Sequence, residues 1–493
     1  MEHPLLYQIN SRCWLRSLSD QTGRAVTFAN VPDSEFEQWQ RLGFTHIWLM
    51  GVWATGARAR QQAIGEPNLR SAYDWMIPGW TEKDVGGSPY SIADYSVPQA
   101  MGGDAGLKQF RARLNGLGMK LVLDFVPNHV GFDHPWVAQR PELFVQSATR
   151  IEGTFAQQTS SGTKWIANAK DPYFPPWSDV AQLDYRRAAT RAAMKSLLLS
   201  VAGRCDGVRC DMAMLLLNDV IARTWSHLPT VPDAPEGEFW TDAIPAVKRA
   251  NPGFLFMAEV YWGLEGHLQS LGFDFTYDKS LYDDLIWRNH SWAQRRVLES
   301  PIEYVTHSVH FIENHDEPRV AEKLSPAENC AAALTILALP GMRMLHEGQL
   351  TGAKIKVPVQ LSRRPVEEVN REVLDGYEAI LFALEPTSVG KGRASILRPR
   401  AAWADNPTGL NFIVVQWQTK GPDFDLVVVN LAPHPSQCYV TLDIQELASH
   451  DWTMNDLVGG EMYVRSGNEL NLDGLYLDAK AHATHVFHFS PAR

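Results

Sequence analysis

Four short segments of this chain each consist of an apolar run that ends in carboxylate, imidazole or amide side chains. They span residues 121–129, 207–211, 254–260 and 311–316. Such runs are typical of parallel strands buried on both faces, and the reactive groups of a parallel barrel lie at the C-terminal ends of its strands. The four segments therefore predict an α/β barrel with one polar site on its rim.

Further apolar runs alternate with helical patterns through about the first 370 residues. The clearest unit has Leu107, Phe110 and Leu114 at helical spacing, Gly118 at the end of the helix, and a strand over 120–126. The other expected strands lie at 5–9, 46–50, around 207, around 254, and at 273–277, 308–312 and 342–345. Eight strands alternating with helices predict a (β/α)8 TIM barrel, which we assign to residues 1–385.

Two long interruptions and one change of pattern divide the remaining sequence. Residues 51–103 show no convincing helix or strand, and residues 130–185 form a loop-rich insertion, rich in Trp, Pro and Phe, after the third strand. Long loops at the C-terminal rim of a barrel often carry binding specificity. Short alternating strands follow from residue 386, so residues 386–493 predict a C-terminal antiparallel all-β domain.

The composition argues against several classes of protein. A net charge of −11 disfavours a nucleic-acid partner, which would require a basic face. The first residues do not resemble a signal peptide, and no run of about 18 apolar residues suggests a membrane span. The five cysteines are scattered, so we expect buried thiols and a cytoplasmic protein without a disulfide framework. The sequence does not indicate the oligomeric state.

The acids at the predicted strand ends suit the cleavage of a glycosidic bond. A retaining glycosidase needs two carboxyl groups about 5–5.5 Å apart. Asp211 and Glu259 end neighbouring strands, which lie about 4.8 Å apart in a sheet. Arg209 points to the same side of its strand as Asp211 and would keep that acid ionised. Groups that could hold a sugar by its hydroxyls arrive from other strands: Asp316, His315 and His129.

The motifs at these strand ends resemble the four sequence signatures of the α-amylase family, glycoside hydrolase family 13. Residues 124–129 read D-x-V-x-N-H, residues 207–211 read G-x-R-x-D, Glu259 follows its own strand, and residues 314–316 read N-H-D. The resemblance covers essentially the whole chain, including the insertion (domain B) and the C-terminal domain (domain C). It implies Asp211 as the nucleophile, Glu259 as the general acid and base, and Asp316 as the acid that binds and distorts the substrate.

The same resemblance implies a set of substrate contacts and a supporting role for Asp124. The expected contacts are Tyr90, which would stack on the cleaved sugar, together with Arg209, His129 and His315. Tyr261 and Trp262 follow Glu259 and are placed to line the acceptor side. Trp136, Trp165 and Trp177 of the insertion could be sugar platforms or simply its core.

Two positions depart from the common subtypes of the family. Many α-amylases follow the nucleophile with a Lys-His pair that contacts the sugar, and this chain has Met214 and Leu215 there. Exo-acting α-glucosidases often carry an acid three residues before the stacking tyrosine, and this chain has Gly87. The sequence therefore matches neither ordinary endo-amylases nor the exo-acting enzymes well.

We expect no required cofactor and no metal. Asn128 and Asp184 resemble positions that hold calcium in some relatives, so a Ca²⁺ site is the alternative to a structural hydrogen-bonded pair. The overall interpretation is a retaining enzyme that acts on α-glucosidic bonds of maltooligosaccharides or related small sugars. Hydrolysis and transglycosylation use the same carboxylates, so a glucanotransferase or a trehalose- or sucrose-active isomerase is an alternative. A non-catalytic glucan-binding relative would be expected to have lost one of the three acids.

Overall fold

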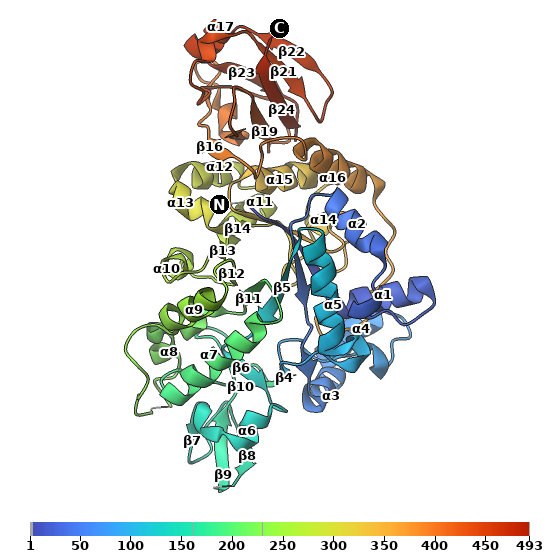
Figure 1. Ribbon diagram of the computed structural model, residues 1–493, viewed down its shortest axis with the longest axis vertical. Helices are drawn as coiled ribbons and strands as arrows, with labels where there is room; N and C mark the ends of the chain where they lie inside the picture. The colour runs from blue at the N-terminus through green and yellow to red at the C-terminus, as the bar shows by residue number, and fades with distance from the viewer. Residues whose placement is uncertain (1–2, 161, 229, 493) are drawn as a thin grey trace.

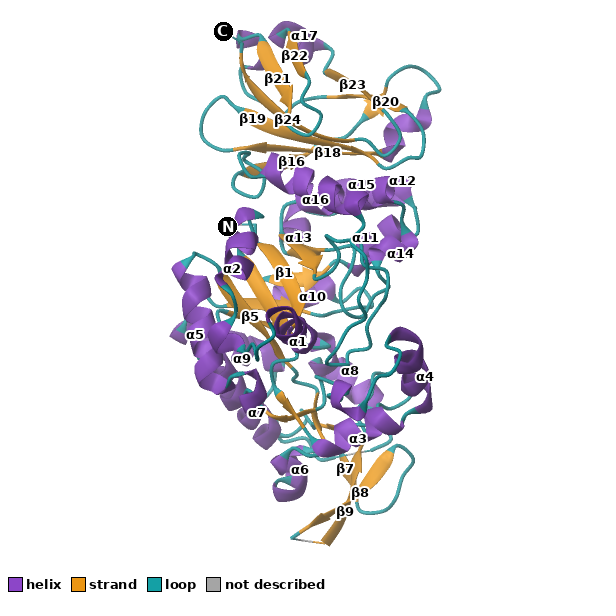
Figure 2. Ribbon diagram, turned by 90° about the vertical axis from the view of Figure 1, so that its right-hand side faces the viewer, coloured by secondary structure: helices purple, strands orange, loops and turns teal. Residues whose placement is uncertain are grey.

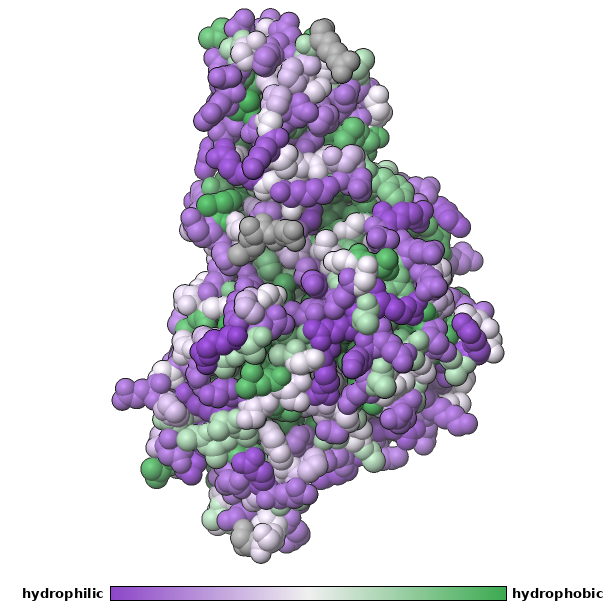
Figure 3. Space-filling model, in the orientation of Figure 1, coloured by the Kyte–Doolittle hydropathy of each residue, from purple (hydrophilic) through white to green (hydrophobic). Residues whose placement is uncertain are grey.

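The computed structural model describes residues 3–160, 162–228 and 230–492. The chain forms a central barrel with an inserted segment at one end and a C-terminal β-rich part at the other (Figure 1). No helix within these described ranges is both long and apolar enough to cross a membrane. Hydrophilic residues predominate on the face drawn in Figure 3, where hydrophobic residues form small separate patches.

The predicted barrel is confirmed. Eight parallel strands close in the order β1-β15-β14-β13-β12-β11-β5-β2. Their bounds are β1 Leu5–Asn10, β2 His46–Met50, β5 Lys120–Phe125, β11 Gly207–Cys210, β12 Leu255–Ala258, β13 Phe275–Tyr277, β14 Ser308–His310 and β15 Met342–His346. Nearly every strand residue is buried, because helices cover the outer face of the barrel and side chains fill its interior.

Amphipathic helices surround the barrel and connect its strands. They include α1 Ser11–Thr22, α2 Asp33–Arg41, α5 Gly103–Gly116, α7 Ala188–Ala202, α8 Asn218–Thr224, α9 Phe239–Ala250, α10 Glu265–Ser270, α11 Lys279–Ile286, α12 His290–Glu299, α13 Ile302–Thr306, α14 Val320–Lys323, α15 Pro326–Ala338 and α16 Arg371–Leu384. Helix α15 begins at a capping box: the Ser325 hydroxyl accepts from the Glu328 amide, and the Glu328 carboxylate accepts from the Ser325 amide. A proline occupies its first helical position.

The expectation that residues 51–103 lack helices and strands is wrong. This segment contains the short antiparallel pair β3 Ala54–Thr55 and β4 Ile92–Asp94, and the helices α3 Ala57–Gly65 and α4 Pro67–Met76. Helix α3 escapes a periodicity search because few of its positions are apolar, whereas α4 carries Leu69, Tyr73 and Met76 at helical spacing, a signal that this expectation missed. The apolar residues of both helices form a small separate core around Tyr73 and Leu361. Glu66 caps α4 before Pro67, a start signal that the sequence does contain.

The insertion after β5 is more regular than its composition suggested. Strand β6 His129–Gly131 pairs with β10 Val180–Gln182, and β7 Gln146–Ser147, β9 Gly162–Ala167 and β8 Thr154–Thr159 form a small antiparallel sheet. Helix α6 Pro135–Gln139 lies beside them. The β6–β10 pair matters for the site, because it holds His129 at the rim of the barrel.

The C-terminal part consists of two antiparallel sheets. One contains β16 Arg393–Ile396, β18 Phe412–Gln418, β19 Phe424–Asn430, β24 Thr484–Pro491, β21 Trp452–Asp456 and β22 Met462–Arg465, and the other β17 Arg400–Ala401, β20 Ser436–Val440 and β23 Leu475–Ala479. The larger sheet lies directly on helices α15 and α16 of the barrel (Figure 2). A short helix, α17 Gly467–Leu472, covers the far end.

Candidate active site

A pocket of about 310 Å³ opens at the C-terminal ends of the barrel strands. Five residues predicted from the sequence line it: Tyr90, His129, Asp211, Glu259 and Asp316. Asp211 and Glu259 each directly follow a barrel strand, β11 and β12, and His129 begins β6. The fold therefore brings side chains from distant segments of the chain to one rim.

A single buried arginine links the acids of this rim. Arg209 lies in β11 with its side chain 0% exposed, and its Nη1 and Nη2 atoms lie 2.7 Å from Asp211 Oδ1 and 2.7 Å from Glu259 Oε2. Asp124, opposite Arg209 on β5, has its Oδ1 atom 3.6 Å from Nη1. Because a guanidinium is planar and rigid, it holds the two carboxylates in a fixed arrangement on either side of it.

Burial and mutual repulsion shift the pKa values of these acids. Burial raises the pKa of Glu259 to about 7; the Arg209 charge opposes the rise, and the charges of Asp211 and Asp316 add to it. Burial also raises the pKa of Asp211 above its ordinary value, against the charge and hydrogen bond of Arg209. From the sequence we expected Arg209 to keep Asp211 ionised; the arginine acts in that direction and limits the rise in pKa that burial causes.

The two acids are suited to opposite roles at neutral pH. Asp211 accepts a hydrogen bond from Arg209, which favours its carboxylate form, whereas Glu259 has the raised pKa of a proton donor. Two carboxyl groups close to one another share protons, and the partner with the stronger cationic hydrogen bond is the one that stays ionised. The arrangement can therefore supply a nucleophile and an acid at the same time.

Asp316 and His315 form the third side of the site. The His315 ring contacts Gln8 Nε2 through Nδ1 at 2.6 Å, and contacts the Tyr90 hydroxyl through Nε2 at 2.7 Å. The same Nε2 atom lies 2.8 Å from Asp316 Oδ2, whose side chain is 45% exposed to the pocket. Desolvation by the rim disfavours ionised Asp316, but the charges of His315 and Arg209 hold its pKa below the ordinary value.

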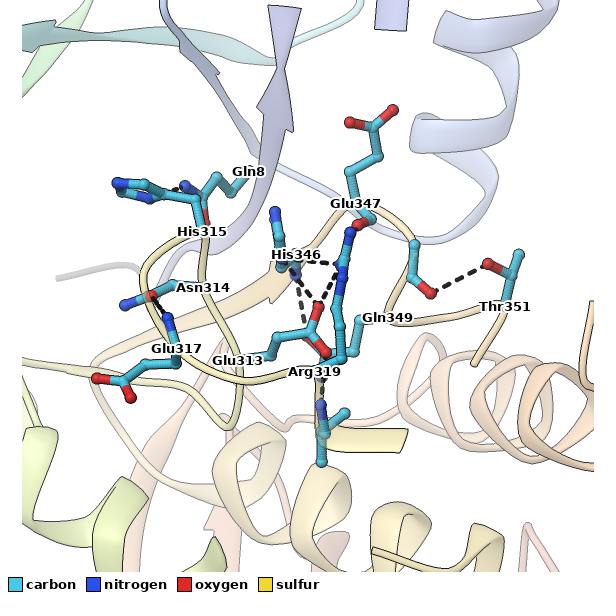
Figure 4. Close-up of polar contacts among 12 residues, drawn as sticks. Gln8, Glu313, Asn314, His315, Glu317, Arg319, His346, Glu347, Gln349 and Thr351 are labelled. Carbon is cyan, nitrogen blue, oxygen red and sulfur yellow. Dashed lines mark hydrogen bonds and ion pairs between the residues drawn. The ribbon is translucent and has the colours of Figure 1, made fainter. Parts of the chain in front are cut away.

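A layer of buried charges fixes the loop that carries these two residues. Glu313 Oε1 lies 2.5 Å from Arg319 Nη1 and 2.8 Å from His346 Nδ1, and Glu313 Oε2 accepts from the Val320 amide at 2.8 Å (Figure 4). Burial raises the pKa of Glu313, but Arg319 and His346 bring it below its ordinary value. The end of the last barrel strand, β15, thus anchors the loop through His346.

The turn after each catalytic strand has an unusual backbone conformation. Met212, directly after Asp211, has a φ of 43°, and its amide donates to Glu259 Oε2 at 2.8 Å. Trp262 has a φ of 68°, is 38% exposed, and meets Tyr173 of the insertion edge to face at 4.9 Å between ring centroids. Left-handed backbone at bulky residues carries strain and is concentrated at functional sites.

The remaining sequence predictions have mixed outcomes. Tyr261 contacts Glu259, with its hydroxyl donating to Oε1 at 2.8 Å. Trp177 lines the pocket beside His129, whereas Trp136 packs on His134 and Trp165 lies near Arg150, away from the pocket wall. Met214 and Leu215 are buried below the site and contribute to the core.

A side chain at position 87 would be strained and crowded. Its φ is 80°, and an added Cβ would lie 3.0 Å from the Arg60 backbone nitrogen in helix α3. Its carbonyl accepts from Arg12 Nη1 at 2.7 Å. The departure from the exo-acting enzymes at this position is therefore built into the packing of α3.

The sequence did not reveal three polar residues of the pocket wall. Asp179 precedes β10, Gln360 lies in the loop after β15, and Ser88 precedes Tyr90. All three come from irregular loops, where no strand end or periodicity marks a side chain as functional. The Lys356 ammonium, from the same loop as Gln360, donates to the Asp316 backbone carbonyl.

Asn128 and Asp184 do not fit a calcium site. Asp184 accepts from Arg186 Nε at 2.7 Å and Nη2 at 2.9 Å, and Asn128 Oδ1 accepts from Gln182 Nε2 at 2.9 Å. The guanidinium already supplies the positive charge that a cation would bring. Within the described ranges, no cluster of three or more His, Cys, Asp or Glu could hold a metal. The expected hydrogen-bonded pair between Asn128 and Asp184 is also wrong, because Asn128 pairs with Gln182 and Asp184 with Arg186.

A closed parallel barrel with carboxylates around a buried arginine on its C-terminal rim is the architecture of a barrel enzyme. Residues 35–373 match the family model described as alpha amylase, catalytic domain. The chain belongs to the α-amylase family.

Individual relatives are distant in sequence. The chain is 24% identical over 288 residues to alpha-amylase MalA of Haloarcula japonica, in an alignment covering 57% of this chain and 39% of that protein. It is 23% identical over 408 residues to maltase 1 of Drosophila virilis, in an alignment that covers 71% of this chain and 58% of that protein. The chain thus spans well under two thirds of the length of these curated relatives.

Solved structures share the whole fold. The maltogenic alpha-amylase AmyB of Thermotoga neapolitana has a TM-score of 0.67 at 19% identity, with 99% of each chain covered. The alpha-amylase of Geobacillus thermoleovorans, solved in complex with acarbose, has a TM-score of 0.66 at 16% identity, also with 99% of each chain covered. At these identities the similarity establishes the architecture, barrel and flanking β parts together.

Proposed function

We propose that this protein is a retaining glycosidase that acts on α-glucosidic bonds of maltooligosaccharides or related small sugars. The observation that carries the proposal is the Arg209 bridge, which holds Asp211 and Glu259 2.7 Å from either end of one guanidinium. An ionised acid and a protonated acid that flank a glycosidic bond can attack the anomeric carbon and protonate the leaving oxygen at once.

The reaction has two halves. Asp211 attacks the anomeric carbon while the proton of Glu259 passes to the glycosidic oxygen, so the bond to the leaving sugar breaks and a glycosyl-aspartate forms. Glu259, now ionised, takes a proton from water or from a sugar hydroxyl, whose oxygen attacks the same carbon and releases Asp211. Asp316, His315 and His129 would hold the hydroxyls of the reacting sugar, with Tyr90 against its ring.

The structure supports the proposal without calling for a metal in any step. Arg209 supplies the fixed positive charge between the acids, and Arg186 neutralises Asp184. The expected partner is therefore a small carbohydrate alone. Met214 lacks the sugar contact of the common endo-acting subtype, and Gly87 lacks the acid of the exo-acting subtype.

Transglycosylation is a second candidate because of a group of exposed aromatic side chains, one of which follows Glu259 closely in the sequence. Tyr173 is 59% exposed and Phe174 67% exposed, and the Tyr173 ring meets the ring of Trp262, which stands shortly after Glu259 in the sequence. Exposed aromatic faces favour a sugar acceptor over water, because they bury the apolar face of the ring. A glucanotransferase or sugar isomerase would use the same acids.

Product analysis distinguishes these outcomes. Wild type and Glu259→Gln are incubated with maltoheptaose, maltose, trehalose and sucrose, with and without free glucose, and products are identified by chromatography and mass spectrometry. We expect products that are absent with the variant. Shorter sugars alone would establish a hydrolase, and longer or rearranged sugars a transferase. Turnover of none of the four would count against the proposal and favour a non-catalytic glucan-binding protein.

A further inference from the structure

The two oxygens of Glu259 have different environments. Oε2 accepts from the Met212 amide at 2.8 Å and lies 2.7 Å from Arg209 Nη2. A backbone N–H is a fixed donor, so the oxygen that accepts from it cannot also carry a proton, whereas a hydroxyl partner can rotate away. The acidic proton of Glu259 therefore belongs on Oε1.

Oε1 has one hydrogen-bond partner among the described residues. The Tyr261 hydroxyl donates to it at 2.8 Å. Tyr261 stands two residues after Glu259, in a turn closed by Trp262 in a left-handed conformation, and its ring is half-buried against the barrel core. The hydroxyl is thus held at the atom that must release and recover the proton.

We propose that Tyr261 is a positioning residue that sets the proton affinity and orientation of Glu259 in both halves of the reaction. This inference rests on the proposed function and changes the expected role of Tyr261 from an acceptor-side sugar contact to a partner of the acid. In the first half the Glu259 proton leaves Oε1 for the glycosidic oxygen, and the Tyr261 O–H then stabilises the new carboxylate. In the second half a proton from the acceptor returns to Oε1, and the Tyr261 hydroxyl turns away from it.

The direction of the effect follows from the hydrogen bond. A donor to the ionised carboxylate favours that form, so Tyr261 opposes the rise in pKa that burial imposes on Glu259. Other charged or titratable groups also face Glu259 from the elements packed around it, and they would be unchanged in a Tyr261 variant. They are Arg209, Asp211, Asp316 and Tyr277.

The test is the pH dependence of Tyr261→Phe. The first half needs protonated Glu259, so the basic limb of kcat/KM reports its pKa in the free enzyme. Losing a hydrogen bond to a charged group should move that limb upward by about one pH unit. Tyr463→Phe, a tyrosine on strand β22 of the C-terminal part, is the matched control and should keep the wild-type profile. If the basic limb of the kcat/KM profile of Tyr261→Phe coincided with that of the wild type, the inference would be overturned.

Two further measurements keep the inference separate from folding and from the choice of substrate. Incorporating 3-fluorotyrosine at position 261 preserves the hydroxyl and strengthens it as a donor, so the limb should move downward, opposite to the phenylalanine variant. Infrared titration of the protonated carboxyl band, with Glu259→Gln as reference, reads the pKa of Glu259 without any turnover. An upward shift there in Tyr261→Phe supports the inference even if none of the four sugars is a substrate, and no shift overturns it even in an active enzyme.

Discussion

At the scale of single residues, Asp211 tests the proposed chemistry most directly. Asp211→Asn keeps the size of the side chain, and Arg209 keeps its contacts with Glu259 and Asp124, so no buried charge is left without a partner. We expect a folded protein whose kcat falls by about 10⁴-fold, because an amide cannot form the glycosyl ester. Circular dichroism and a thermal melt check that the variant is folded, and steady-state kinetics measure the loss of kcat.

Activity near the wild-type level in that variant would contradict the assignment of the nucleophile. The exposed Asp20, paired with Arg16 on helix α1, offers a matched Asp→Asn control that should change neither kcat nor stability noticeably. A surface ion pair of this kind contributes about 0–1 kcal/mol.

Glu313 is expected to contribute mainly to the stability of the fold, whereas Asp211 contributes to catalysis. Glu313→Gln removes the carboxylate between Arg319 and His346 while its side chain is 0% exposed, leaving a buried cation without its partner. We expect the free energy of unfolding to fall by about 3 kcal/mol, measured by urea denaturation. The exposed ion pair Arg295–Glu299 supplies the control: Glu299→Gln should change the free energy of unfolding by less than about 1 kcal/mol. Equal effects of the two variants would refute the anchoring role.

At the scale of elements, helix α3 explains why position 87 is glycine. Gly87 and Gly118 have φ values of 80° and 79°, but an added Cβ meets the α3 backbone at 3.0 Å only at Gly87 and meets nothing within 4 Å at Gly118. Gly118→Ala should therefore destabilise the folded protein by about 1 kcal/mol, solely because alanine disfavours the left-handed backbone conformation. Gly87→Ala should destabilise by at least about 1 kcal/mol more, because the helix must move.

Thermal denaturation of the two variants separates these contributions, and KM for the best substrate reports whether the loop before Tyr90 has shifted. If Gly87→Ala were as stable as Gly118→Ala, the packing of α3 would not be what requires a glycine there.

The barrel strands could be predicted from their apolar pattern and helix α3 could not, for one physical reason. A buried parallel strand such as β5 must be apolar along most of its length, so it can be predicted from that apolar run in the sequence. Helix α3 is largely exposed, covers a small core, and leaves few apolar positions to repeat. The same contrast separates the site residues: Asp211 and Glu259 end strands, whereas Asp179 and Gln360 reach the pocket from loops whose course only the fold determines.

At the scale of the whole molecule, the larger C-terminal sheet belongs to two cores at once. Alternate residues of β18 point to opposite sides: Ile413, Val415 and Trp417 join the core of the barrel, whereas Phe412 and Val414 join the core between the two C-terminal sheets. The Trp417 indole also donates to the Ala338 carbonyl at the end of α15 at 2.8 Å. The apolar face of α15 is thus buried by the sheet.

This shared core predicts that barrel and C-terminal part unfold together. Separating them would expose the apolar faces of both α15 and the sheet, so neither is expected to be stable without the other. Calorimetry of the full chain should give a single unfolding transition. Trp417→Ala removes a fully buried side chain, so it should lower the midpoint temperature of that transition without splitting it into two. Residues 1–385 expressed alone should aggregate. Two separate transitions, or a stable and soluble barrel fragment, would show that the sheet is an independent attachment rather than part of the barrel's own core.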